Sequence, residues 1–184
     1  MNMHRFKVAV DLDGVLADFA RKVAEITNAL PKNELAHIAR IDESIIDKRK
    51  MWRAINEYNS HIPFFLSLDK MCDADLLMGY LMLNFPKEDI MILSASGTTP
   101  ADAPEQKRAW VKRHFSEMFH GNILTEIVTK SSEKARFATP TTILIDDRAK
   151  SIDPWVDAGG IGILHTSSSS TIKELDRIIY GQVE

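Results

Sequence analysis

Short apolar runs alternate with longer amphipathic stretches along most of this chain. Five runs rich in β-branched residues are bounded by turn residues, a pattern typical of buried strands. They span residues 6–10, 90–93, 123–128, 142–145 and 161–164. Helical patterns lie between or after them, at 73–83, 103–119, 133–138, 150–157 and around 172–179, the last preceded by a possible serine cap at 167–170. This alternation predicts an α/β fold, a Rossmann-like parallel sheet of about five strands with helices on both faces.

Residues 20–68 interrupt this alternation and are called the insertion below. Helical patterns at 21–29, 34–40 and 44–58 make it far longer than an ordinary crossover between strands. We therefore expect a small helical cap at 20–68, inserted into a core formed by residues 1–19 and 69–184. Met51, Trp52 and Ile55 are expected to form an apolar face of the cap, with Trp52 either in the cap's own core or in a ligand pocket.

Composition narrows the classes of function. The chain has 184 residues, enough for one core with a small inserted subdomain. A net charge of -3 argues against stable binding to nucleic acid, and the lack of a long apolar run argues against a membrane span. The single cysteine, Cys72, excludes an internal disulfide and is expected to be at least half-buried. We expect a cytoplasmic protein; its oligomeric state, a homodimer included, stays open.

Two carboxylates follow the first apolar run. Asp11 and Asp13 are two residues apart, so in extended chain their side chains point the same way. Their mutual repulsion requires a cation or a shared proton. Gly14 then permits a sharp turn away from the strand. Ligands of α/β sheets bind at this edge, where the strands end.

Further polar residues occur where other strands end. Ser94 closes the run at 90–93, and Asp146 and Asp147 close the run at 142–145. Lys134 lies at the start of a predicted short helix, just before that last run. Four carboxylates in one cleft repel one another unless positive charge lies between them. Mg²⁺ can supply this charge, because it prefers oxygen ligands and commonly bridges carboxylates to a substrate phosphate. A lysine, a hydroxyl and backbone N–H groups near Gly14 would then meet the phosphate.

The chain resembles the haloacid-dehalogenase-like phosphohydrolases in four motifs that follow in the same order. These are Asp11 to Val15, Ser94 after an apolar strand, a lysine, and Asp146-Asp147 after another strand. The block 11–19, Phe64-Phe65, the stretch 105–115 and Leu144 to Arg148 are more closely similar to the 5'(3')-deoxyribonucleotidases of bacterial and phage type. The chain departs from that group after the second strand, where Ser94-Ala95-Ser96-Gly97 stands in place of the frequent Thr-Ser-Pro.

The resemblance implies a role for each matching residue. Asp11 would be the nucleophile that forms an aspartyl-phosphate, and Asp13 the acid and then the base. Phosphate contacts would come from Gly14, Ser94, Ala95 and Lys134. Of the two lysines upstream of the acidic pair, Lys130 and Lys134, we favour Lys134 because its distance from that pair is closer to the family's. Mg²⁺ would be held by Asp11, Asp13 through its backbone carbonyl, Asp146 and Asp147, and of the last two we favour Asp147 as the direct ligand. Phe19 matches a substrate-pocket aromatic of the family. Trp52, Phe64 and Phe65 are further candidates for the pocket because they lie in or beside the insertion that would cover the cleft.

The expected function is therefore an Mg²⁺-dependent phosphomonoesterase acting on a small phosphate ester, above all a nucleoside monophosphate. Alternatives are a phosphatase of a sugar phosphate or similar ester, and a phosphotransferase, because both use the same aspartyl chemistry. A non-catalytic binding protein on the same fold is disfavoured because both Asp11 and Asp13 are intact.

Overall fold

One parallel sheet forms the centre of the molecule. The computed structural model describes residues 6–35, 40–41 and 47–181, and its strands follow the order β3-β2-β1-β4-β5. The strands are β1 (Lys7–Val10), β2 (Ile90–Ala95), β3 (Leu124–Val128), β4 (Thr142–Asp146) and β5 (Ile161–Leu164). All four pairings are parallel. The predicted fold class is confirmed.

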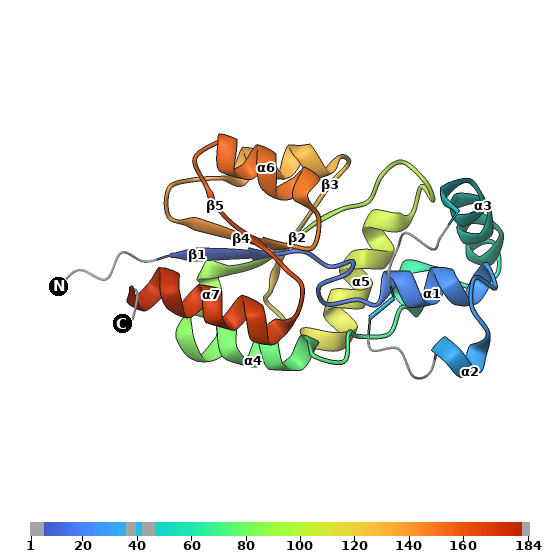
Figure 1. Ribbon diagram of the computed structural model, residues 1–184, viewed down its shortest axis with the longest axis horizontal. Helices are drawn as coiled ribbons and strands as arrows, with labels where there is room; N and C mark the ends of the chain where they lie inside the picture. The colour runs from blue at the N-terminus through green and yellow to red at the C-terminus, as the bar shows by residue number, and fades with distance from the viewer. Residues whose placement is uncertain (1–5, 36–39, 42–46, 182–184) are drawn as a thin grey trace.

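Helices cover both faces of the sheet (Figure 1). On one face, Val8, Val10 and Ile145 pack with α4 (Ala74–Asn84), α5 (Ala103–Phe115) and α7 (Ser168–Tyr180). On the other, Ala9 and Leu144 pack against α6 (Ala149–Asp157), with the 3₁₀ helix η4 (Ser131–Phe137) beside it. The alternation of side chains along each strand supplies both cores.

The predicted helix boundaries need three corrections. The helix expected over 103–119 ends at Phe115, and the stretch expected to be helical at 133–138 is the 3₁₀ helix η4. Helix α1 (Phe19–Ile26) stops before residue 29, because Thr27 caps it and Asn28 turns the chain with a φ of 51°. The serine cap is confirmed, since the Ser167 side chain accepts a hydrogen bond from the N–H of Ser170.

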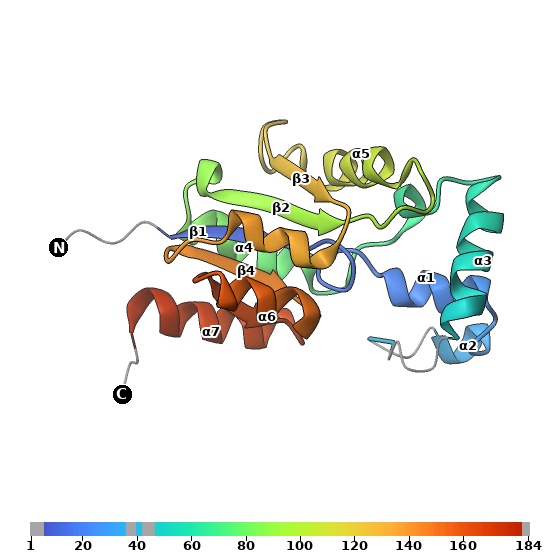
Figure 2. The same ribbon diagram turned by 90° about the horizontal axis from the view of Figure 1, so that it is seen from above.

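The helices of the insertion lie beyond the carboxyl ends of the strands (Figures 1 and 2). They are α1, α2 (Lys32–Leu35) and α3 (Lys48–Asn59), followed by the 3₁₀ helix η2 (Phe65–Ser67). The stretches predicted as helical at 34–40 and 44–58 fall partly outside the described residues. Within α3, Ile55 is buried, whereas Trp52 is 40% exposed. The insertion is thus placed at the edge where the polar residues gather.

Two expectations concern the surface. Cys72 is exposed, contrary to the prediction, because it lies in the turn that precedes α4, next to the buried Met71. Within the described residues, no helix has the length and apolar character needed to cross a membrane.

Candidate active site

The loop that follows β1 is compact and held by its own backbone. Asp11 donates its N–H to the carbonyl of Ile145, which ties the end of β1 to β4. Further along, the N–H groups of Leu16 and Ala17 both donate to the carbonyl of Leu12. This arrangement fixes Asp11 and Asp13 at the carboxyl edge of the sheet.

Gly14 is required by this loop for two reasons. Its φ is +76°, a backbone conformation that residues with a side chain rarely adopt. In addition, a Cβ atom there would lie 2.0 Å from Oδ2 of Asp147. The absence of a side chain thus lets Asp147 approach the loop. The N–H of Gly14 donates to Ala17 within the loop, so the structure does not offer it to a phosphate as expected.

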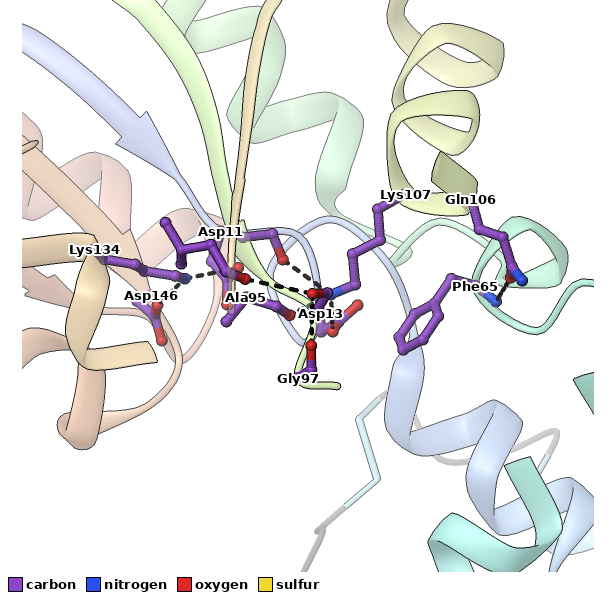
Figure 3. Close-up of polar contacts among 12 residues, drawn as sticks. Asp11, Asp13, Phe65, Ala95, Gly97, Gln106, Lys107, Lys134 and Asp146 are labelled. Carbon is purple, nitrogen blue, oxygen red and sulfur yellow. Dashed lines mark hydrogen bonds and ion pairs between the residues drawn. The ribbon is translucent and has the colours of Figure 1, made fainter. Parts of the chain in front are cut away.

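The ammonium group of Lys134 forms ion pairs with two of the carboxylates. Its Nζ lies 2.8 Å from Asp11 Oδ1 and 2.6 Å from Asp146 Oδ2, and the lysine is 1% exposed (Figure 3). Burial favours the neutral amine, yet the two carboxylates outweigh it and raise the pKa of Lys134. Lys134 is therefore the buried lysine of this cluster, whereas Lys130 is exposed.

The two carboxylates beside Lys134 differ in their pKa. Burial would raise the pKa of Asp11, but Lys134 and Lys107 together hold it below its ordinary value. Burial and the neighbouring Asp11 raise the pKa of Asp146 to about 6, despite Lys134. Asp11 is thus kept as a carboxylate, the form that a nucleophile needs.

Lys107 is a site residue that sequence reasoning missed. It comes from α5, has no exposed surface, and its Nζ lies 2.6 Å from Asp13 Oδ2 (Figure 3). The same ammonium group donates to Ser94 Oγ at 3.1 Å and to the Ala95 carbonyl at 2.8 Å. Burial raises the pKa of Asp13, with a further contribution from Asp11, against the attraction of Lys107. The only signal in the sequence was a lysine amid the apolar pattern of a core helix.

The acidic cluster fits a divalent cation. Asp11, Asp146 and Asp147 each present an oxygen, and these oxygens lie within 4.8 Å of one another. Among the described residues, the buried Oδ1 of Asp13 has no hydrogen-bond partner, so it is available to another ligand. Carboxylate oxygens are the ligands that Mg²⁺ prefers. The donor set and the space left by Gly14 are thus compatible with the expected metal.

A cavity of about 640 Å³ opens above Asp11 and Asp13. Phe19, Trp52 and Phe65 line one wall, as predicted, and Ala95 lies on another. Phe64 does not reach the cavity: it has no exposed surface and packs edge-on against the rings of Phe19 and Phe65. It supports the aromatic wall from behind.

Two phosphate residues expected from sequence lie below the cavity floor. Ser94 is 1% exposed and receives the Lys107 hydrogen bond, while Lys134 sits beneath Asp11. Ser96 and Gly97 both line the cavity, and the Ser96 hydroxyl donates to the Gly97 carbonyl at 2.9 Å. Lys130, the alternative lysine, is exposed and also lines it.

Sequence comparison assigns the chain to a family. Residues 5–178 match the family described as 5' nucleotidase, deoxy (pyrimidine), cytosolic type C protein. No curated protein matches the sequence.

Solved structures share the fold. A haloacid dehalogenase-like family hydrolase from Streptococcus pneumoniae superposes with a TM-score of 0.58 at 13% identity, covering 97% of this chain and 99% of the other. The L-2-haloacid dehalogenase from Xanthobacter autotrophicus gives 0.53 at 14% identity, covering 98% and 84%. A putative β-phosphoglucomutase from Bacteroides vulgatus gives 0.52 at 15% identity, covering 99% and 92%.

Proposed function

Because the chain belongs to the family of 5' deoxy (pyrimidine) nucleotidases of cytosolic type C, and is thus a nucleotidase-like phosphoric monoester hydrolase, we propose that it dephosphorylates (deoxy)nucleoside monophosphates with Mg²⁺. The observation that carries this proposal is the make-up of the 640 Å³ cavity. Its floor holds Asp11 and Asp13, and its wall holds aromatic rings. One end suits phosphate chemistry and the other suits a planar base, since a base–aromatic stack contributes about 1–3 kcal/mol.

The first half of the proposed reaction uses both acids. An Asp11 oxygen attacks the phosphorus, the bond from phosphorus to the sugar oxygen breaks, and the departing oxygen takes a proton from Asp13. Lys134 contacts the nucleophile and keeps it ionised. Lys107 contacts Oδ2 of Asp13 and so fixes the direction of the acid.

The second half regenerates the enzyme. Asp13, now a carboxylate, accepts a proton from water as that water attacks the phosphorus of the phosphorylated Asp11, which releases phosphate and restores the Asp11 carboxylate. The carboxylates of Asp11, Asp146 and Asp147 would hold the Mg²⁺. We propose that the backbone carbonyl of Asp13 is a further ligand. When bound, the cation neutralises charge on the phosphate and on the nucleophile that it would otherwise repel.

Substrate choice is assigned to the insertion. We propose that residues 20–68 act as a cap over a core made of 1–19 and 69–184. Trp52 and Met51 of α3 line the same cavity as Asp11, which lies in the core. Phe19 and Phe65, at the two ends of the insertion, stack with their ring centroids 6.2 Å apart. The cap thus contributes the apolar wall against which a base would stack.

A phosphate-release screen tests this proposal. Nucleoside 5'- and 3'-monophosphates, sugar phosphates and p-nitrophenyl phosphate are compared with Mg²⁺ present. We expect deoxynucleoside monophosphates to have the highest kcat/KM. A sugar phosphate that surpasses every nucleotide would replace the proposed substrate class, and phosphate transferred to an acceptor instead of released would indicate a phosphotransferase.

A further inference from the structure

Three cationic side chains surround the mouth of the 640 Å³ cavity. Lys48 comes from α3, Lys130 follows β3, and Arg148 follows β4; together they are called the cationic rim. All three are exposed, and among the described residues none of them forms an ion pair within 4.0 Å. Lys150 also lines the cavity but already has an interaction of its own, so it is left out of the count.

The negative charge beneath the cavity is already offset without the rim. Four ionised carboxylates, Asp11, Asp13, Asp146 and Asp147, against two buried ammonium groups, Lys107 and Lys134, would leave two negative charges, and the proton that Asp13 carries as the proposed acid lowers this to one. A divalent cation at the acidic cluster more than offsets this charge. The rim then adds three positive charges, and the dianion of one phosphate monoester compensates only two of them.

The wall beside Lys130 also offers hydroxyl groups. Thr129, Ser131 and Ser132 line the same part of the cavity. Hydroxyls and cations together are the donors that phosphate oxygens accept from. A single exposed ion pair contributes little to affinity, whereas several cations around one phosphate act together.

We propose that the cationic rim binds a second phosphate group, so that nucleotides carrying two phosphates bind this cavity more tightly than nucleoside monophosphates. The proposal rests on the proposed function, because it takes one phosphate to lie at Asp11. The second phosphate can come from a 3',5'-bisphosphorylated nucleoside or from a 5'-diphosphate. Both carry a second phosphate. In the bisphosphate it is a separate dianion on the other side of the sugar, and in the diphosphate it is the adjoining phosphate, a dianion when terminal and a monoanion when internal.

Competition experiments separate the two sources. A deoxynucleoside 5'-monophosphate, the matching 3',5'-bisphosphate and the matching 5'-diphosphate are each used to inhibit hydrolysis of p-nitrophenyl phosphate. Free Mg²⁺ is held constant and in excess. A hydrogen bond to a charged group changes an affinity roughly tenfold, so we expect at least one doubly phosphorylated nucleotide to have a Ki about tenfold lower. Salt at about 0.5 M should remove most of this advantage, since the rim is exposed.

Variants of the rim locate the effect. The measured quantity is the Ki of the monophosphate divided by the Ki of the doubly phosphorylated nucleotide. Lys48→Gln and Lys130→Gln should each reduce this ratio toward one. Arg53 is an exposed residue of α3, the helix that carries Lys48, and it does not line the cavity. Arg53→Gln should therefore leave the ratio unchanged. Calorimetry with the same nucleotides gives the dissociation constants independently of turnover.

The outcomes distinguish this proposal from the proposed function. If the monophosphate competes but neither doubly phosphorylated nucleotide binds more tightly, the rim proposal is overturned and the nucleotidase proposal stands. An advantage that survives both rim variants also overturns it. If p-nitrophenyl phosphate is hydrolysed and no nucleotide competes, the nucleotidase proposal itself fails.

Discussion

The ammonium group of Lys107 lies 2.6 Å from Oδ2 of Asp13, although 94 residues separate the two in sequence. Helix α5 carries the lysine through the core to the edge of the sheet, where it also contacts Ser94 and Ala95. The Phe65 ring lies 4.7 Å from the same nitrogen, in a cation–π contact. Lys107 thereby connects the proposed acid, the end of β2 and the aromatic wall.

Replacing Lys107 tests this connection. Lys107→Met removes the positive charge that pairs with Asp13. It also leaves the Ser94 hydroxyl and the Ala95 carbonyl without their hydrogen-bond donor. We expect a loss of about 3 kcal/mol in the free energy of unfolding, since one partner of a buried pair is removed. The value of kcat should fall roughly 100-fold, more than KM changes, because the proton donor is no longer positioned.

Urea unfolding and steady-state kinetics measure both effects. Lys112→Met, an exposed lysine on the same helix, is the matched control and should change neither quantity. Equal stability and equal kcat for the two variants would contradict the positioning role of Lys107.

Gly14 offers a second test, directed at the acidic cluster. Gly14→Ala places a methyl group 2.0 Å from the present position of Asp147 Oδ2, so this carboxylate must move. We expect the dissociation constant of Mg²⁺ to rise by at least about tenfold, a change of about 1.4 kcal/mol. Calorimetric titration with Mg²⁺ measures it.

Gly159→Ala controls for backbone strain. Gly159 also has a positive φ, +88°, but a Cβ there meets nothing within 4 Å. Both variants therefore share the conformational penalty, and only Gly14→Ala displaces a carboxylate. Mg²⁺ affinities that agree between the two would show that Asp147 takes no part in the metal site.

Removal of the metal should abolish activity. A chelator is expected to stop phosphate release, and Mg²⁺ added back should restore it, whereas Ca²⁺ should bind without supporting turnover because it accepts more and longer contacts. At a concentration about 100-fold above its Kd, Mg²⁺ should stabilise the native state by about 2.7 kcal/mol. Thermal unfolding with and without Mg²⁺ records this independently of activity.

Asp147→Asn should abolish the thermal shift, and Asp157→Asn, which removes an exposed carboxylate at the end of α6, should preserve it. Full phosphate release in chelator would rule out the metal requirement.

The aromatic wall is tested through Trp52. This side chain is 40% exposed, so Trp52→Ala removes a stacking surface with little loss of packing. We expect kcat/KM for a nucleotide to fall about 5- to 100-fold more than that for p-nitrophenyl phosphate, which carries no base. Tyr180→Ala, at an exposed aromatic residue on α7, is the control. A proportional loss on both substrates would assign Trp52 a structural role only.

The sequence was informative where local pattern decides the structure. The strands and the acids that end them, Asp11 and Asp146, follow from apolar runs and from the rule that ligands gather at the carboxyl edge. The choice of Lys134 over Lys130 as the phosphate lysine rested on the spacing in the resembled family. Lys134 is buried beside Asp11, and its contact with phosphate stays a prediction.

Features that depend on long-range packing could not be predicted. Lys107 lies in an amphipathic helix where a lysine ordinarily faces solvent, and only the approach of α5 to the loop after β1 buries it. Phe64 and Phe65 are neighbours in sequence and both are buried, yet only Phe65 lines the cavity. The cationic rim joins residues from three distant segments, a juxtaposition that no local pattern predicts.

The most direct test of the proposed mechanism is an acid-quenched turnover with a ³²P-labelled deoxynucleoside 5'-monophosphate and Mg²⁺. If Asp11 becomes phosphorylated, label should remain covalently attached to the wild-type protein after denaturation and be released by hydroxylamine. Asp11→Asn, nearly identical in shape, should retain no label and release no phosphate while keeping the wild-type Tm within a few degrees. Rapid phosphate release without labelled protein at any time, or label retained by Asp11→Asn, would contradict the assignment of Asp11 as the nucleophile.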